Sequence, residues 1–324
     1  MKRREFLRRS TLLGAAALAG TRLVPSLLAE QSAGATTPAT KASAPAADAA
    51  AQPDLAVVES TDTFAATLRA VELAGGIGRF VKPGAKVGLL INAPNWWRKP
   101  GSFTSPDVTL AVLQLCLDAG AAEITYIIDP ANDYWTRTPL GAQYPKLTAA
   151  GRKNPGEWTD REIPRGVALK QAKVNRAYLD CEVLINLPIA KHHAGTGYSG
   201  CLKNTMGACH RTTNQFFHTG SGTKGEYEDV AFLSQCIADV NLVRRPTLNI
   251  CDGTEFLLTN GPAGPGELRQ AHKVVVGANP VAVDAYGCTL LGLTAAKVAM
   301  IGLAAAHGLG EPDLTKLNVR QAKL

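Results

Sequence analysis

Residues 182–193 read E-V-L-I-N-L-P-I-A-K-H-H, an apolar run that leads directly into a lysine and two histidines. The length and apolar character of 182–187 are typical of a strand that is buried on both faces. The polar groups that follow therefore emerge together where this strand ends. Loops at such places carry binding and catalytic residues, because a rigid scaffold positions them. We predict that the segment 186–210 is the functional site.

Strand-like and helix-like patterns alternate along the chain on both sides of this strand. We expect strands at 55–59, 86–92, 123–129, 182–187, 247–252, 272–277 and 317–321. We expect helices at 63–80, 108–119, 226–243, 280–291 and 295–306. Such alternation favours an α/β fold with a mainly parallel sheet covered by helices on both faces. The length of 54–324 suits a single large domain or two closely packed lobes.

The N-terminus has the layout of an export signal. The arginine pair Arg3-Arg4 precedes Phe6-Leu7, an apolar stretch covers 12–19, and small residues at 33–35 offer a cleavage site. An arginine pair in this place is typical of the twin-arginine route. We therefore expect residues 1–35 to be a signal peptide that engages the twin-arginine translocation machinery, with the protein exported to the periplasm or cell envelope. An uncleaved N-terminal anchor is the alternative.

The segment 36–53 consists mostly of Ala, Thr and Pro. It cannot bury enough apolar surface to offset its ordering entropy, so we expect a disordered linker before the α/β domain. The formal net charge of the chain is +7, of which 1–35 contributes +4 from six Lys/Arg and two Asp/Glu. The remainder is nearly balanced and has no block of clustered Lys/Arg with interleaved aromatic residues. We therefore expect no nucleic-acid partner.

Asparagine or aspartate falls at the carboxyl end of four predicted strands. These residues are Asn92, Asp129, Asn186 and Asp252. Open parallel α/β sheets bind ligands outside the carboxyl ends of their strands. If the four strands are neighbours, these side chains share a rim with the segment 191–193. The alternative for each residue is that it only begins a turn.

Two lysines flank a glycine-rich loop in the segment 186–210. Lys191 and Lys203 supply positive charge, and backbone N–H groups exposed by Gly195, Gly197 and Gly200 can cradle an anion. The glycine spacing matches the dinucleotide fingerprint formally, but it begins too far beyond the strand. We therefore expect a small anionic ligand. The alternative is a flexible loop whose glycines only permit tight turns.

His192 and His193 are candidate metal ligands or proton carriers, since imidazole titrates near neutrality. Asp252 and Asp284 offer oxygen ligands, and imidazole with carboxylate suits a divalent transition metal such as zinc, iron or nickel. The predicted metal site consists of His192, His193, Asp252 and Asp284, although their spacing matches no compact metal motif. In the alternative, the histidines are bonded to the backbone or solvated and Asp284 has a structural role at a helix start.

The chain has seven cysteines, so at least one has no partner within the chain. Cys201 and Cys209 have three candidate roles: a disulfide that staples the loop, metal ligands, or a nucleophile beside His210. We favour the disulfide. No C-x-x-C occurs, let alone the repeated spacing of an iron–sulfur site, so we do not expect an iron–sulfur cluster.

The chain resembles the family called domain of unknown function 362 from about Val87 to Gly310. The matching pieces are L-I-N-A-P at 90–94, D-A-G-A at 118–121, N-L-P-I-A-K-H-H at 186–193, S-G-C-L-K-N at 199–204, D-G at 252–253, V-G-A-N-P-V-A-V-D-A at 276–285 and G-L-G at 308–310. The resemblance implies an α/β fold and an uncharacterised activity. Some relatives carry ferredoxin-like cysteine clusters, which this chain lacks. The expected ligand-binding residues are Asn92, Asp129, Asn186, Gly200 and Asn204.

Two classes of function follow. The first is an exported enzyme with a metal or anion site, in which His192 or His193 is a ligand or base and Lys191 and Lys203 hold a small anionic substrate. The second is a non-catalytic envelope protein that binds a small anionic ligand or a redox partner. Trp96-Trp97-Arg98 either forms a lid that stacks on the ligand or packs against the loop around Trp135.

Overall fold

A seven-stranded sheet organises the computed structural model, which describes residues 52–96, 99–220 and 229–324. The strand order is β11-β1-β10-β9-β6-β2-β3. The strands are β1 (Leu55–Glu59), β2 (Lys86–Ile91), β3 (Glu123–Tyr126), β6 (Val183–Leu187), β9 (Leu248–Leu257), β10 (Leu268–Gly277) and β11 (Val319–Lys323). Only β10 runs antiparallel to its neighbours in this sheet. The predicted α/β fold with a mainly parallel sheet is confirmed.

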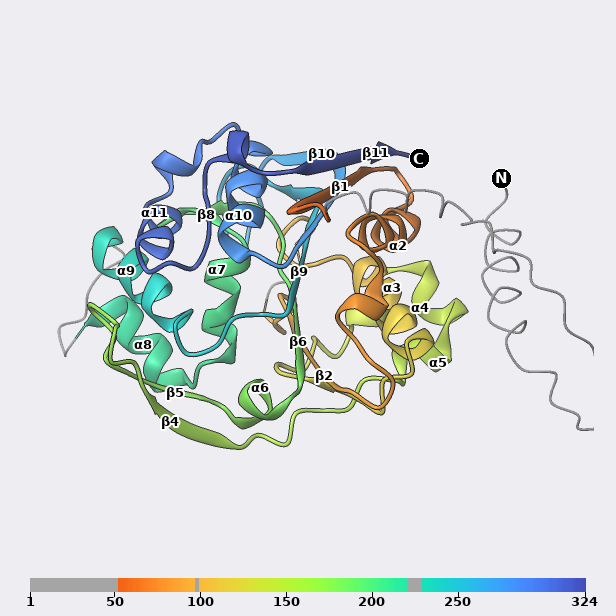
Figure 1. Ribbon diagram of the computed structural model, residues 1–324, viewed down its shortest axis with the longest axis horizontal. Coiled ribbons are helices and arrows are strands. Elements are labelled where there is room, and N and C mark those ends of the chain that lie inside the picture. Colours follow the sequence, from red (N-terminus) through yellow and green to blue (C-terminus); the bar gives the residue numbers. More distant parts are fainter. Residues whose placement is uncertain (1–51, 97–98, 221–228) are drawn as a thin grey trace, which may run out of the picture. The chain divides into compact units, whose positions relative to one another are not determined.

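Helices cover both faces of the sheet (Figure 1). One face carries α2 (Thr63–Leu73), α3 (Pro106–Asp118), α4 (Pro139–Gln143) and α5 (Pro145–Thr148). The other carries α7 (Cys201–Asn204), α9 (Val230–Val240), α10 (Pro280–Thr289) and α11 (Ala299–Ala306). Each face has its own core, because successive strand residues point to opposite sides. In β6, for example, Leu184 joins the core under α9 to α11 and Ile185 joins the core under α2 and α3.

Shorter elements fill the connections. They are α6 (Arg176–Asp180), α8 (Arg211–Thr219), the hairpin of β4 (Trp158–Glu162) and β5 (Gln171–Asn175), and the hairpin of β7 (Lys191–His193) and β8 (Gly197–Ser199). Five 3-10 turns complete the described part: η1 (Ile77–Arg79), η2 (Tyr134–Arg137), η3 (Thr205–Ala208), η4 (Ala295–Lys297) and η5 (Leu314–Lys316). The β7–β8 hairpin lies within the segment 186–210, where we expected only a loop.

Several predicted boundaries are wrong. The helix expected over 63–80 ends at Leu73, because Gly75 and Gly76 adopt φ values of 102° and 80° that a helix cannot contain. The helix expected over 295–306 divides into η4 and α11. The strands expected at 247–252 and 272–277 are ten residues long each, since both continue together as a long antiparallel pair. These extensions place Asp252 inside β9 instead of at its end.

The range Ala50–Leu324 forms one compact unit. The predicted signal peptide, and the linker up to residue 51, lie outside the described residues. No helix in the described part of the chain combines the length and apolar character needed to cross a membrane.

Candidate functional site

A pocket of about 480 Å³ opens outside the carboxyl ends of β2 and β3. We call it the carboxyl-end pocket. Its described lining residues are Ile91, Asn92, Pro94, Trp96, Ile128, His193, Ser199, Lys203, Asn204, Met206, Gly207, Cys209, Arg211, Asn214, His218 and Pro262. They come from the loops after β2 and β3, the β7–β8 hairpin, α7, η3, α8 and the loop between β9 and β10. The segment 186–210 therefore supplies much of the wall, at the edge of the sheet where ligands of such folds bind.

The chain reaches the pocket by leaving β6 alongside β9. Ile189 bridges to Asp252, and the N–H of Ala190 donates to the Asp252 carbonyl at 2.8 Å. The β7–β8 hairpin then pairs Lys191 with Ser199 and His193 with Gly197. This path fixes the two histidines to a rigid strand, so their side chains must point to opposite sides.

Helix α7 begins at a close approach between Gly200 and Asp284 of α10. The Asp284 carboxylate accepts hydrogen bonds from the N–H groups of Cys201 at 2.5 Å and Leu202 at 2.9 Å. A Cβ at position 200 would lie 2.2 Å from Asp284 Oδ1 and 2.3 Å from the Tyr198 hydroxyl, so only glycine fits. Burial raises the pKa of Asp284 to about 6. Asp284 therefore has a structural role, as the acceptor for the first N–H groups of α7.

Four buried asparagines connect α7 to the sheet. The Asn204 amide donates to the Leu90 carbonyl at 3.0 Å and to Asn186 Oδ1 at 2.8 Å. Its Oδ1 accepts from Asn92 Nδ2 at 3.0 Å. Asn186 in turn donates to Asn249 Oδ1 at 3.0 Å. This amide network places α7, and Lys203 with it, over the ends of the strands.

Lys191 lies beneath the pocket, with 0% of its surface exposed. Its ammonium group donates to Asn92 Oδ1 at 3.3 Å and to the Ser102 carbonyl oxygen. Burial, and then the charge of Lys203, hold the pKa of Lys191 well below its usual range. Lys191 therefore joins β7 to the loop after β2 and is not among the described residues that line the pocket.

The two predicted histidines have different surroundings. His193 lines the pocket, and its Nδ1 accepts from the N–H groups of Gly195 at 3.1 Å and Thr196 at 3.2 Å. Burial and then the Lys203 charge lower the pKa of His193 to about 2. His193 is therefore a neutral imidazole whose proton is on Nε2. His192 accepts from the N–H of Gly261 at 3.1 Å and faces the loop between β9 and β10.

Lys203 is a half-buried cation on the wall of the pocket. Within the described residues, the one hydrogen bond of its ammonium group goes to the sulfur of Met206 at 3.1 Å. A thioether is a weak acceptor, so this bond compensates little of the lost hydration. Burial lowers the pKa of Lys203 to about 8, and its charge in turn lowers the pKa values of Lys191, His193 and His218.

Helix α8 supplies basic and polar groups that we did not predict from the sequence. Arg211, Asn214 and His218 all line the pocket. Their spacing of three and four residues places them on one helical face, and this spacing is the signal that identifies them. None of the described residues that line the pocket is acidic. This described part of the carboxyl-end pocket is therefore electropositive, since Lys203 and Arg211 have no acidic neighbour in it.

Two predicted rim residues lie elsewhere. Asp129 accepts from the N–H of Asn154 at 2.8 Å, a contact that joins the loop after β3 to the segment before β4. Asp252 accepts from the N–H of Ser105 at 2.7 Å and from the Thr254 hydroxyl at 2.6 Å, and it lines a separate hollow of about 360 Å³. Burial raises the pKa of Asp252. Of the four predicted rim residues, only Asn92 both follows its strand and lines the carboxyl-end pocket.

The four residues of the predicted metal site do not share a coordination sphere. Asp284 and Asp252 are bound to different backbone segments, and His192 and His193 point apart. Across residues 52–96, 99–220 and 229–324, no group of three or more His, Cys, Asp or Glu side chains is arranged to hold a metal ion. Folding separates these side chains because each satisfies a different part of the backbone.

The predicted disulfide between Cys201 and Cys209 is wrong, because all seven cysteines are free thiols. Cys201 begins α7 and Cys209 follows η3, so the helical segment between them spans roughly 12 Å. A disulfide needs Cα atoms about 5.5–6 Å apart. Burial raises the pKa of Cys209 to about 12, which makes it an unreactive thiol on the pocket wall.

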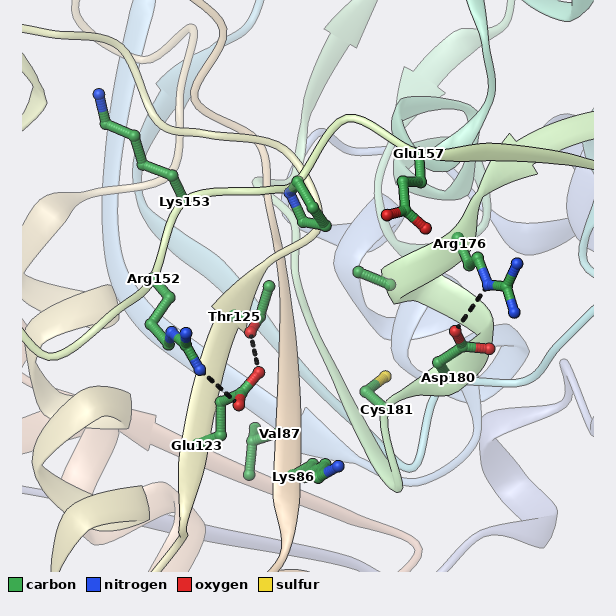
Figure 2. Close-up of a pocket in the computed structure, with 12 residues that line it drawn as sticks. Lys86, Val87, Glu123, Thr125, Arg152, Lys153, Glu157, Arg176, Asp180 and Cys181 are labelled. Carbon is green, nitrogen blue, oxygen red and sulfur yellow. Dashed lines mark hydrogen bonds and ion pairs between the residues drawn. The ribbon is translucent and has the colours of Figure 1, made fainter.

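A second hollow of about 300 Å³ lies at the amino ends of β2 and β3, and we call it the amino-end pocket (Figure 2). Figure 2 shows two ion pairs among its charged side chains. Arg152 contacts Glu123 at 2.6 Å, and Arg176 contacts Asp180 at 3.1 Å. Acidic and basic side chains are mixed on the wall of this pocket. Since ligands of such sheets bind at the carboxyl ends of the strands, the carboxyl-end pocket is the better candidate.

Comparisons with known proteins identify a family and two similar proteins. A family model described as domain of unknown function (DUF362) matches residues 87–289. A thylakoid-associated protein of Synechocystis sp. is 25% identical over 206 residues, covering 63% of this chain and 62% of that protein. The chain thus spans less than two thirds of this curated relative. The lactate racemase apoprotein of Thermoanaerobacterium thermosaccharolyticum is similar in structure, with 15% identity, a TM-score of 0.36, and coverage of 60% of this chain and 50% of that one.

Proposed function

This chain belongs to the family of the domain of unknown function DUF362, and we propose that it binds a small anionic ligand in the carboxyl-end pocket. One observation carries the proposal. Lys203 is a half-buried cation on the pocket wall, and within the described residues its one hydrogen bond goes to a thioether sulfur. A group of this kind gains more from an anionic oxygen than from water or sulfur.

The surroundings of Lys203 support an anion for a second reason. The described lining residues include Arg211 and two histidines and no acidic residue. Burial lowers the pKa values of both histidines, and the Lys203 charge lowers them further, so the positive charge acts across the pocket. A bound anion compensates this charge. His193 adds a neutral N–H donor, since its Nδ1 is occupied as an acceptor.

Calorimetric titration of the purified protein with phosphate, acetate and benzoate at pH 7 and low salt tests the proposal. We expect Lys203→Met to weaken binding at least about tenfold, because a hydrogen bond to a charged group contributes about 1.5–3 kcal/mol. Lys153→Met, on the wall of the amino-end pocket, is the matched control and leaves binding unchanged. Absence of measurable binding of all three anions to the unmodified protein contradicts the proposal.

An enzyme acting on the bound anion is the second candidate. The observation that favours it is the pKa of Lys203 near 8, which is close enough to neutrality for proton transfer. NMR detection of deuterium exchange from D₂O into carbon-bound positions of pyruvate and phenylacetate tests it. Exchange that requires Lys203 and is lost in Lys203→Arg supports an enzyme, and equal exchange with and without protein contradicts it.

The proposal includes export to the periplasm or cell envelope by the twin-arginine machinery. Its support is the order of an arginine pair, an apolar stretch and small residues within 1–35. Such a route suits a binding protein or an enzyme that folds before it is exported.

A further inference from the structure

The wall of the carboxyl-end pocket has two chemically different parts. Lys203, His193 and Asn204 supply charge and hydrogen-bonding groups. Other lining residues offer only apolar or aromatic surface: Ile91, Pro94, Trp96, Ile128, Met206 and Pro262. Ligand sites of this composition bind the apolar body of a molecule with most of their wall and orient it with few polar groups. An inorganic anion such as phosphate would contact only the polar part of the wall and leave the apolar part without a partner.

Trp96 gives the apolar part of the wall a surface that suits an aromatic ring. Its side chain is 76% exposed although it lines the pocket, so most of the indole is in contact with water. An exposed indole beside a pocket offers a flat surface on which a ring can stack, and stacked rings gain more than their buried area alone provides. A ring placed there removes apolar surface of both partners from water.

The polar part sets the charge of the ligand. Among the described lining residues, Lys203 is the one half-buried Lys or Arg, His193 is neutral, and Arg211 is exposed at the start of α8. One such cation balances one negative charge. The pocket volume of about 480 Å³ is within the range of small-molecule sites, and it greatly exceeds the size of phosphate or acetate.

On the premise that the pocket binds an anion, we infer that its ligand is a small aromatic monocarboxylate, with the ring against Trp96 and the carboxylate bound by Lys203. The inference rests on the proposed function and adds the class of ligand. It assigns Trp96 as the residue that determines specificity, beside Lys203 as the residue that binds charge.

Ligand-observed NMR titration of the full chain with phenylacetate, acetate and benzyl alcohol tests the inference. We expect phenylacetate to bind at least tenfold more tightly than acetate, and benzyl alcohol, which has the ring without the charge, to bind at least tenfold more weakly than phenylacetate. Trp96→Ala reduces the ratio of phenylacetate to acetate affinity to below threefold. Trp158→Ala removes a Trp that is 40% exposed on β4, outside the pocket, and leaves this ratio unchanged.

The outcomes separate the inference from its premise. Equal affinities for phenylacetate and acetate overturn the aromatic assignment and leave anion binding intact. Benzyl alcohol that binds as tightly as phenylacetate overturns the role of the carboxylate. A ratio that is the same in Trp96→Ala and the unmodified protein removes Trp96 from the site. If phenylacetate, acetate and phosphate all fail to bind, the proposed function fails, and the inference fails with it.

Discussion

Lys203 and His193 both line the carboxyl-end pocket, but at neutral pH Lys203 is charged and His193 is not. Burial lowers the pKa of both side chains, because the charged form loses its hydration. The ordinary pKa of a lysine is so high that, even when lowered to about 8, it leaves most Lys203 side chains protonated at pH 7. The ordinary pKa of a histidine is already close to 7. Lowered to about 2, it leaves His193 uncharged at all ordinary pH values. Lys203 is therefore the group that binds an anion, and His193 is a fixed hydrogen-bond donor.

The pH dependence of anion binding follows from these pKa directions. Since only protonated Lys203 attracts the anion, affinity is highest below pH 7 and falls as the pH rises through about 8. Calorimetric titration with phenylacetate, which stays ionised across this range, measures the midpoint. His193 contributes no midpoint between pH 5 and 8, because its pKa of about 2 keeps it neutral there. A loss of affinity centred near pH 6 would instead show that a histidine charge binds the ligand.

At the scale of elements, the one-turn helix α7 positions the site. It is too short to be stable alone, so its place depends on contacts with other elements. Asp284 of α10 binds its first N–H groups, and Asn204 joins it to β2 and β6. The β7–β8 hairpin presents His193 from the other side. The site is therefore held by α10, the sheet and the hairpin together, and a disturbance at Gly200 affects all of them.

Gly200→Ala tests this packing. The added Cβ meets Asp284 and Tyr198, both in the core, so we expect a loss of about 1–3 kcal/mol in the free energy of unfolding, measured by urea denaturation. We also expect weaker anion binding, since α7 carries Lys203. Gly302→Ala is the matched control, because nothing lies within 4 Å of its Cβ in α11. It should be neutral or slightly stabilising. Equal effects of the two substitutions would contradict the close packing at Gly200.

At the scale of the molecule, the sheet separates two hollows of different character. The amino-end pocket contains acidic and basic side chains that form two ion pairs, and the described wall of the carboxyl-end pocket has basic side chains and no acidic one. The parallel strands β9, β6, β2 and β3 create this polarity, because all four end on the same edge. The antiparallel β10 belongs to the far part of the sheet and supplies no residue of the carboxyl-end pocket.

The export proposal concerns the whole chain and is tested on it. We expect replacement of Arg3 and Arg4 by lysine to stop export, because the arginine pair is the feature that the translocation machinery recognises. Fractionation of cells that express tagged full-length protein measures how much reaches the periplasm. Replacement of Arg8 and Arg9 by lysine is the matched control, since it changes another arginine pair and keeps the charge. Export that is unaffected by either replacement excludes the twin-arginine route.

The fold was predictable because strands and helices in it follow local patterns. The run 183–187 is apolar except for Asn186 and becomes a fully buried central strand, and Pro280 after Asn279 starts α10 where the cap pattern indicates. The site was predictable in part. Lys203, Asn92, Asn204 and His193 line the pocket, whereas Asp252, Asp284 and Lys191 support the fold around it. A side chain that caps a helix and one that binds a ligand have the same chemistry, so residue type does not distinguish them.

The sequence by itself determined the α/β architecture, the family resemblance and the segment that carries the site. These properties depend on hydrophobic periodicity and residue order, which are local. Only the tertiary structure decided that His193 and not His192 faces the pocket, that Lys203 has a thioether for its partner, and that Trp96 and α8 complete the wall. These properties depend on contacts between residues far apart in the chain, because burial and unsatisfied charge exist only after the strands and helices have packed.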